Sequence, residues 1–350
     1  MLIKKDKILT IDKYIHEALY NKKNGYYMVV NPFGKEGDFT TAPNISILFS
    51  EMIAIWIISF WESLNCPKEF NLIELGAGNG EMMMDVVKSF ERFPLFKDCC
   101  KINILEKSPY LKKIQKIKLK NKKIKWIKHV DELSNIPCIF IANEFFDALP
   151  IKQFIKKKNK WYERNIKISK SKKPRFLDIL TDINKLEKKI GFNISYKQNF
   201  IEFSPLVFEY LKKISKKINI CKGGILIIDY GYMSNKMKNT LQSVSNHKYS
   251  YLLNNFTSSD ITYNLSFKLM EQMLKKFNLK INGKTNQKKF LINLGILKRA
   301  EIISKKLTFS QKADIYYRVK RLIDKNLMGE LFKVVFAAAK GVRFKVGFVN

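Results

Sequence analysis

The sequence predicts an α/β fold built on a doubly wound, mostly parallel sheet. The first indication is the corner at residues 70–80, where an apolar run ending in an acid is followed by glycines 76, 78 and 80. A helix-compatible segment, 81–90, comes next, and strand, glycine turn and helix together form a nucleotide-binding corner. The second indication is that apolar runs and helical segments alternate along the chain, which is typical of parallel sheets with right-handed crossovers.

Five runs have the length and composition of buried strands: 70–75, 101–106, 124–129, 137–142 and 224–229. Continuous apolar runs are expected where helices cover both faces of a sheet. The other segments expected to be ordered are helices at 11–23, 44–64, 81–90, 109–119, 265–278 and 296–325, a partial helix at 177–190, hairpin strands at 153–155 and 161–163, a basic loop at 167–175, and a closing strand within 331–339.

The chain of 350 residues is long enough for one large domain with additions or for two domains. We expect residues 1–65 to form an N-terminal helical extension that covers the ligand site. Residues 66–150 would form the first part of the core and 151–220 an insertion between the fourth and fifth strands, where a substrate-selecting element could sit. Residues 221–350 would complete the core and add helices.

The net charge of +34 invites a nucleic-acid interpretation. Only seven of the 65 basic residues are arginine, and the lysines are spread along the whole chain. Proteins that recognise bases and phosphates favour arginine, whose planar guanidinium donates two parallel hydrogen bonds. The charge therefore indicates a compositional bias on solvated faces, and a nucleic-acid partner is not expected.

The cysteine and histidine patterns indicate that the thiols are reduced and that no metal is bound, and the hydropathy pattern bears on location. The five cysteines form no C-x-x-C and the three histidines are scattered. No apolar signal core follows the N-terminus, and the longest apolar run, 52–61, is about half of a membrane span. We expect a soluble, cytoplasmic protein.

The glycine turn itself has a chemical preference. Its pattern is E-x-G-x-G-x-G, with Glu74 two residues before the first glycine, whereas the dinucleotide fingerprint is G-x-G-x-x-G. A carboxylate here would repel a pyrophosphate but would suit the ammonium of an amino acid, which S-adenosyl-L-methionine carries. The turn favours a methyl donor over NAD; the alternative is a glycine-rich surface turn.

Other candidate ligand residues follow strands or precede helices. Glu106 lies 26 residues past Gly80, near the place where an acid binds ribose hydroxyls, although it could instead cap the next helix. The stretches 143–150 and 229–231 also lie at strand ends, where ligands of such sheets bind. The polar turn 37–43 is either a helix cap or a ligand wall, and its candidate ligand residues are Asp38, Thr40, Thr41 and Pro43.

Several motifs together resemble one family, the mitochondrial complex I assembly arginine methyltransferases and their bacterial relatives, known as the MidA family. The stretches that carry the resemblance are 37–43 (GDFTTAP), 74–76 (ELG), 143–150 (NEFFDALP), 229–232 (DYGY), 240–242 (TLQ), 260–262 (DIT), 290–296 (FLxxLGI) and 328–334 (MGxLFKV). They run in order through almost the whole chain.

The resemblance implies a class I S-adenosyl-L-methionine-dependent methyltransferase with a seven-stranded sheet whose last strand is antiparallel. Its cofactor would become S-adenosyl-L-homocysteine. Eukaryotic relatives are described as methylating an arginine on a core subunit of respiratory complex I. The positions expected to bind the cofactor are Asp38, Thr40, Thr41, Pro43, Glu74, Gly76, Ala77, Gly78, Gly80, Glu106 and Asn143.

The chain departs from the family pattern in two places. Ala77 and Asn79 replace a proline and an arginine in the glycine turn. After the motif at 260–262, Asn264 and Ser266 replace a histidine and an acid. The second departure puts substrate handling in doubt more than cofactor binding.

Methyl transfer needs alignment and a suitable electrostatic setting more than covalent chemistry. Asn143 is expected where methyl group and acceptor meet, and Glu144 and Asp147 are candidates to hold a guanidinium. Phe145 and Phe146 could form an aromatic wall or ordinary core.

Two other functions stay open, a non-catalytic cofactor-binding assembly partner and an RNA methyltransferase. A homodimer is also open, because helix 44–64 could be core or interface.

Overall fold

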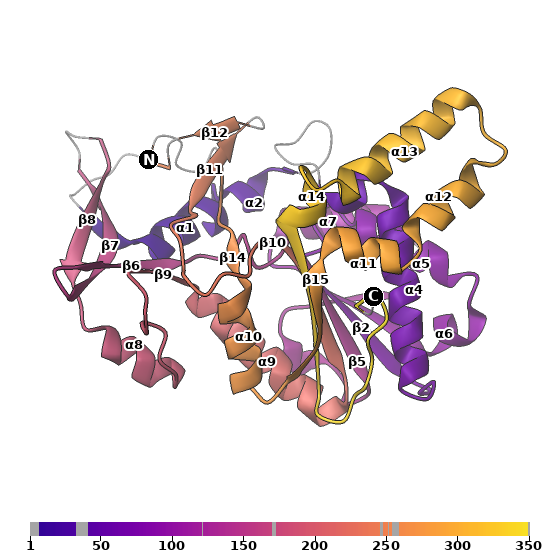
Figure 1. The fold of residues 1–350 in the computed structure, drawn as a ribbon, viewed down its shortest axis with the longest axis horizontal. Helices are drawn as coiled ribbons and strands as arrows, with labels where there is room; N and C mark the ends of the chain where they lie inside the picture. Colours follow the sequence, from indigo (N-terminus) through magenta and orange to yellow (C-terminus); the bar gives the residue numbers. More distant parts are fainter. Residues whose placement is uncertain are drawn as a thin grey trace.

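The computed structural model describes residues 7–32, 41–120, 122–169, 173–245, 248–250, 252–253 and 259–348. Its centre is a sheet in the order β15-β16-β10-β5-β2-β3-β4, with β14 also paired to β10 (Figure 1). These strands are β2 (Phe70–Leu75), β3 (Cys100–Leu105), β4 (Ile124–Ile127), β5 (Cys138–Asn143), β10 (Gly224–Tyr232), β14 (Leu265–Ser266), β15 (Lys280–Asn286) and β16 (Phe332–Ala338).

Strands β4, β3, β2, β5 and β10 pair in parallel, whereas β16 runs antiparallel to both β10 and β15. The expectation of an α/β protein with a mostly parallel central sheet is confirmed. The carboxyl ends of the parallel strands lie at the same edge of the sheet, where ligands of such folds bind.

Helices cover both faces of this sheet. On one side lie α4 (Ile47–Ser63) and α5 (Glu81–Phe90), and on the other lie α9 (Pro205–Cys221) and α10 (Phe267–Lys276) (Figure 1). Helix α4 buries Trp56 and Phe60, whose rings stack at a centroid distance of 5.9 Å. Most of its apolar residues are buried within the chain, which makes it a core helix.

A second, antiparallel sheet lies to the left of the central one (Figure 1). Its order is β1-β7-β6-β9, and β8 pairs with β7. The strands are β1 (Lys7–Thr10), β6 (Lys152–Lys157), β7 (Lys160–Ile168), β8 (Arg175–Leu180) and β9 (Phe200–Phe203). Four of them come from the chain between β5 and β10, and β1 joins the N-terminal segment to them. Helix α9, which falls almost entirely within 151–220, packs against β5 of the central sheet.

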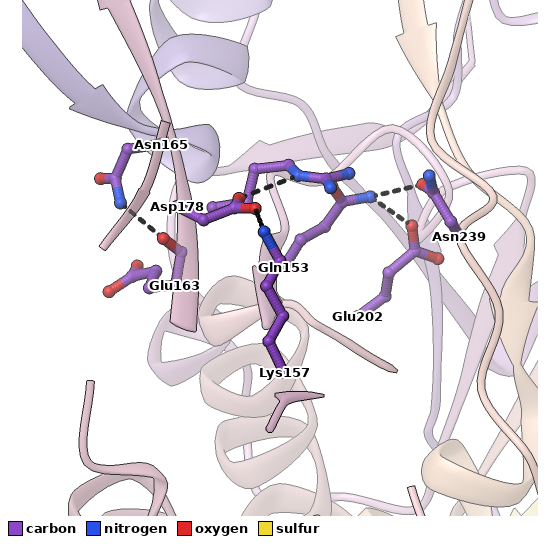
Figure 2. A network of polar contacts seen from close by, with 8 residues as sticks. Gln153, Lys157, Glu163, Asn165, Asp178, Glu202 and Asn239 are labelled. Atoms are coloured by element: carbon purple, nitrogen blue, oxygen red, sulfur yellow. Dashed lines mark hydrogen bonds and ion pairs between the residues drawn. The ribbon is translucent and has the colours of Figure 1, made fainter. Parts of the chain in front are cut away.

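Polar contacts fasten the second sheet to the chain after β10 (Figure 2). Gln153 Nε2 donates to Glu202 Oε1 at 2.8 Å and to Asn239 Oδ1 at 2.9 Å. Asp178 accepts from Lys157 and Arg164 in the same sheet. The Glu202 carboxylate also accepts the backbone N–H groups of Thr240 and Leu241. The segment leading to β11 (Gln242–Ser245) and β13 (Asp260–Thr262) is thus held against this sheet.

Some expected elements differ from those observed. The partial helix expected at 177–190 is strand β8 followed by α8 (Ile183–Ile190), because Asp182 caps the helix by accepting the Asn184 N–H at 3.0 Å. The expected basic loop at 167–175 begins within β7 and ends at β8. The helix expected at 11–23 ends earlier, as α1 (Ile11–Tyr20), and a separate short helix, α2 (Tyr26–Val29), follows it. The helix expected at 296–325 is divided into α12 (Ile296–Ser304) and α13 (Phe309–Ile323).

The remaining elements are α3 (Ala42–Ile45), α6 (Pro94–Cys99), α7 (Pro109–Lys118), the short 3-10 turn η1 (Val130–Glu132), β12 (Lys248–Ser250), α11 (Gln287–Asn293) and α14 (Met328–Leu331). None of the helices described combines the length and apolar composition needed to cross a bilayer. Within the described residues, no cluster of His, Cys, Asp or Glu side chains is arranged to hold a metal.

Candidate active site

Two adjoining cavities open at the carboxyl edge of the parallel strands. The larger is lined by the N-terminal helices, the glycine turn, the segment after β3, the loop after β5, and parts of α9, β10 and β13. The smaller lies between the glycine turn and α3. Both cavities are lined by Thr41, Gly76, Gly78 and Glu144, so they form one continuous site.

The glycine turn needs glycine for its backbone and for its contacts. Gly76, Gly78 and Gly80 have φ values of +65°, +52° and +80°, which side chains rarely adopt. A Cβ at Gly76 would lie 2.7 Å from Phe145 Cδ2. Gly76 and Gly78 line both cavities and Ala77 lines the smaller one, whereas Gly80 lines neither and is the N-cap residue of α5.

Glu74 lies beneath this turn, 4% exposed, at the wall of the smaller cavity. Its Oε2 has no hydrogen-bond partner among the described residues. Burial, with a smaller contribution from Glu106, raises the pKa of Glu74 to about 8. A cation entering this cavity would supply the missing partner.

Glu106 is fixed by hydrogen bonds at the wall of the larger cavity. Its Oε1 accepts the Ser108 N–H at 2.8 Å and its Oε2 accepts from Gln115 Nε2 at 2.9 Å. It therefore supports the start of α7 and also lines the cavity, and burial raises its pKa. Gln115 was not predicted as a site residue; the sequence signal for it is its place four residues after Leu111 on the buried face of α7.

The segment before α4 lies across the smaller cavity, where Thr41 and Pro43 are lining residues. The backbone N–H of Ala42 donates to Glu144 Oε1 at 3.3 Å, and Thr41 Oγ1 donates to Asn44 Oδ1 at 2.8 Å. Asp38 and Thr40, also expected to bind the cofactor, lie outside the described residues.

Asn143 ends β5 and lines the smaller cavity, and Glu144, the next residue, lines both cavities. Asn143 Nδ2 donates to Glu144 Oε1 at 3.4 Å, while no described group pairs with Asn143 Oδ1. Glu144 has a φ of +49°, an uncommon backbone for a residue with a side chain. Burial, with Asp147 as the second cause, raises the pKa of Glu144 to about 8.

Asp147 is 7% exposed, and only one of its two carboxylate oxygens is hydrogen-bonded within the described structure. Its Oδ2 accepts from the Tyr230 hydroxyl and, at 3.0 Å, from Thr262 Oγ1, while Oδ1 has no partner in the described structure. Burial raises the pKa of Asp147 and these two hydrogen bonds oppose the rise. Asp229 lies underneath, where it accepts the backbone N–H groups of Phe146 and Asp147.

Side chains from distant segments complete the larger cavity: Tyr20, Tyr27, Tyr210, Tyr230 and Asp260. Tyr27 donates to Asp260 Oδ1 at 2.8 Å and Tyr20 donates to the Ala148 carbonyl at 3.0 Å. Tyr230 and Asp260 lie in the motifs at 229–232 and 260–262, whereas no sequence pattern marks Tyr20, Tyr27 and Tyr210, because these three meet the others only in the folded chain. Of the two phenylalanines after β5, Phe145 lines the cavity and Phe146 is fully buried.

The altered segment after β13 is not part of either cavity lining. Tyr263 donates to the Phe146 carbonyl at 2.9 Å, and Ser266 caps α10 by accepting the Leu269 N–H at 3.4 Å. The Asn264 N–H donates to Thr240 Oγ1 at 3.1 Å. In the glycine turn, the Asn79 side chain accepts the Glu81 N–H at 3.2 Å at the start of α5.

Comparison with known proteins agrees with this geometry. Residues 52–285 match a protein family described as "Putative S-adenosyl-L-methionine-dependent methyltransferase". The chain is 30% identical to "Protein arginine methyltransferase NDUFAF7, mitochondrial" of Xenopus laevis, over 95% of this chain and 81% of that protein. The human protein of the same name is 27% identical, over 94% of this chain and 80% of its own length.

A crystal structure from Burkholderia thailandensis, bound to S-adenosyl-homocysteine, has the same fold. It superposes with a TM-score of 0.82 and 21% identity, covering 97% of this chain and 90% of that one. The comparisons correct one expectation: the curated relatives are named as mitochondrial proteins, which contradicts a cytoplasmic location. The glycine turn, the acids at the strand ends and the family match together show that this chain belongs to the S-adenosyl-L-methionine-dependent methyltransferases.

Proposed function

We propose that the chain transfers methyl groups from S-adenosyl-L-methionine to an arginine side chain of a protein. One observation carries the proposal. Although the chain has a net charge of +34, the charged lining of the larger cavity consists of one lysine, Lys107, and four carboxylates: Glu106, Glu144, Asp147 and Asp260. A lining of this kind favours a cationic acceptor such as a guanidinium.

The residues present fit the cofactor. The unpartnered Oε2 of Glu74 would accept from its ammonium, and Glu106, already oriented by Gln115, would accept from its ribose. Because its glycines carry no side chains, the backbone of the turn is accessible between Glu74 and Glu106. Asn143, Ala77, Thr41 and Pro43 line the smaller cavity beside Glu74, and we propose that they contact the methionine part. The bound cofactor supplies an electrophilic methyl group.

The carboxylates of the chain would prepare the acceptor. Glu144 and the free Oδ1 of Asp147 are placed to hold a guanidinium, which is charged and a poor nucleophile with a pKa above about 12. Binding that cation would ionise Glu144, whose pKa is about 8 without it. The methylated nitrogen must release a proton, and Glu144 is the partly exposed carboxylate placed to accept it.

The substrate class comes from the relatives, which are named protein arginine methyltransferases. The family resemblance implies a respiratory complex I subunit in eukaryotes, and we propose a protein of that kind here. The second sheet, β6 to β9, would help to select it because it lies in the chain directly after the acceptor loop 143–150.

Mass spectrometry of protein methylation would test the proposal, in cells with the chain and in cells without it. Purified chain with labelled cofactor should then methylate the protein so identified. Glu144→Gln should lower kcat by about 100-fold or more with cofactor affinity retained, whereas the exposed Glu62→Gln should change neither. Unchanged turnover in Glu144→Gln, or no arginine product, would refute the proposal.

A non-catalytic cofactor-binding partner is the main competing function. The departures at Asn264 and Ser266 motivated it, but neither residue lines the cavities. An RNA methyltransferase is disfavoured because three acidic side chains, Glu144, Asp147 and Asp260, line the larger cavity besides the Glu106 assigned to the ribose, and a phosphodiester would be repelled there.

A further inference from the structure

Helices α12 and α13 pack together as a hairpin that projects from one end of the molecule (Figure 1). The base of the hairpin is fixed to α4 and α3. Arg299 of α12 donates to both carboxylate oxygens of Glu51 on α4, at 2.8 and 2.9 Å. Arg318 Nη1 of α13 donates to the Ile45 carbonyl of α3 at 3.2 Å. The outer end, where residues 305–308 join the two helices, is therefore held away from the core in a defined position.

Apolar side chains are exposed on the outer part of this hairpin. Phe309, the first residue of α13, is 88% exposed, and Tyr317, about two turns later, is 63% exposed. Tyr316 on the same helix and Ile302 on α12 are exposed as well. Residues seven and eight positions apart share one face of a helix, so Phe309 and the two tyrosines lie on the same side of α13. Single exposed apolar residues are ordinary, but a group of them on a projecting end indicates an association surface.

The outer hairpin also carries positive charge that the protein does not neutralise. Four of its lysines form no ion pair within the described residues: Lys305, Lys306, Lys312 and Lys320. The two helices contain only two acids, and both are already paired. Glu301 pairs with Lys298 at 2.9 Å. Asp314 pairs with Arg318 at 2.7 Å. Exposed aromatic rings and uncompensated lysines thus occur together.

We propose that the outer end of the α12–α13 hairpin binds the surface of a bilayer that contains anionic phospholipid. Phe309 and Tyr317 would enter the boundary between head groups and acyl chains, where aromatic side chains are enriched. The four lysines would lie at the level of the lipid phosphates, because anionic leaflets attract basic segments. The inference goes beyond the proposed function, since it concerns where the enzyme is held and not which arginine it methylates.

The chemistry of the hairpin favours a lipid surface over a nucleic acid. Single-stranded RNA also binds basic surfaces with aromatic rings, but the aliphatic Ile302 offers no ring for a base to stack on. The cations nearest to Phe309 in the sequence are lysines, which lack the planar fork that suits phosphates and bases. A bilayer also accommodates a projecting end directly, because lipid head groups move aside for it, whereas a protein partner needs a matching concave site.

Co-sedimentation of the full chain with sucrose-loaded vesicles would test the inference. One set of vesicles contains phosphatidylcholine and phosphatidylglycerol in equal parts, and the other contains phosphatidylcholine alone. The aromatic variant is Phe309→Gln with Tyr317→Gln. The lysine variant carries three substitutions at exposed positions: Lys305→Gln, Lys306→Gln and Lys320→Gln.

Each variant has a matched control elsewhere on the surface. Leu95→Gln with Tyr196→Gln removes two apolar side chains that are 81% and 67% exposed. The lysine control removes the same charge from three exposed positions on α8: Lys185→Gln, Lys188→Gln and Lys189→Gln. This control is needed because a net charge of +34 attracts any anionic surface without a specific site.

The native chain should bind the anionic vesicles about tenfold or more tightly than the neutral ones. Each hairpin variant should lose about tenfold of that affinity, whereas both controls should keep it within about threefold. Cofactor affinity should be unchanged in all four. Losses in the controls equal to those in the hairpin variants would overturn the inference, and so would native affinity in the aromatic variant. Hairpin-dependent self-association or binding of single-stranded RNA, without binding to vesicles, would also overturn it.

Discussion

Gln115 connects Glu106 to the glycine turn: its Nε2 donates to Glu106 Oε2 at 2.9 Å and to the Gly78 carbonyl at 2.8 Å. The same side chain accepts from Trp126 Nε1 at 2.9 Å through Oε1. One fully buried amide therefore fixes the expected ribose ligand relative to the turn on which we propose that the cofactor lies. The two halves of the proposed cofactor site are positioned by a residue that lines neither cavity.

Gln115→Leu should weaken cofactor binding by about tenfold and lower the free energy of unfolding by about 1–3 kcal/mol, because the Gly78 carbonyl and the Trp126 indole lose their partner. Calorimetric titration and urea unfolding measure the two effects. Trp126→Phe is the control, since it removes only the bond to Oε1 and should reduce stability alone. Equal loss of affinity in both variants would contradict a positioning role.

Gly76→Ala should destabilise the protein through two separable effects. A side chain at φ +65° costs about 1–2 kcal/mol, and the new Cβ would also lie 2.7 Å from Phe145 Cδ2. In a Phe145→Ala background the clash is removed and only the backbone cost remains. A double-mutant cycle by urea unfolding should give a coupling of about 0.5 kcal/mol or more; additive effects would show that the Phe145 contact does not matter.

The fold was predictable wherever a segment's own pattern determines its structure. Residues 70–75 and 81–90 were predicted with the observed bounds, because a buried parallel strand is a continuous apolar run and the helix follows a glycine turn. Segment 177–190 was not, since its strand half is specified by pairing with β7. Similarly, Glu74 and Glu106 could be found from their places after strands, whereas Tyr27 and Asp260, 233 residues apart, meet only through tertiary packing.

Cofactor affinity should depend on pH through Glu74. Its carboxyl has a pKa of about 8 in the free protein, so at neutral pH it must lose a proton before it can pair with an ammonium. Affinity should therefore rise between pH 6 and pH 8, and binding at pH 7 should release a proton. Titration calorimetry in two buffers of different ionisation enthalpy measures that proton. Glu74→Gln should bind weakly at every pH and release none; proton release by this variant would assign the titration to another group.

The same pKa affects stability in the opposite direction. Between pH 4.5 and about 8 the folded chain holds a proton on Glu74 that the unfolded chain has lost. The free energy of unfolding of the cofactor-free protein should therefore fall as pH rises through this window. Urea unfolding at several pH values should show a smaller decrease in Glu74→Gln, and an equal decrease would exclude Glu74 as its source.

Tyr230→Phe should shift the pH dependence of turnover. The Tyr230 hydroxyl and Thr262 Oγ1 both donate to Asp147 Oδ2 and lower the pKa of that carboxyl against the effect of burial. Without the hydroxyl the pKa of Asp147 should rise, so the acidic limb of kcat/KM should move to higher pH. Activity should fall more at pH 6.5 than at pH 9. A uniform loss at all pH values would indicate a packing effect, which Tyr230 shares with Phe332.

Restoring the family residues at 264 and 266 should have little effect. Ser266 caps α10, and aspartate serves equally well at that position. Asn264 is held through its backbone, whose N–H and C=O both pair with Thr240, and neither side chain lines the cavities. The double variant Asn264→His with Ser266→Asp should therefore keep cofactor affinity and turnover within about twofold, because substitutions outside such features rarely exceed about 0.5 kcal/mol. Thr262→Val is the contrasting variant, since it removes a donor to Asp147 and should lower turnover. If the double variant instead raised turnover tenfold, these two departures would limit the native chain, and the non-catalytic function would regain support.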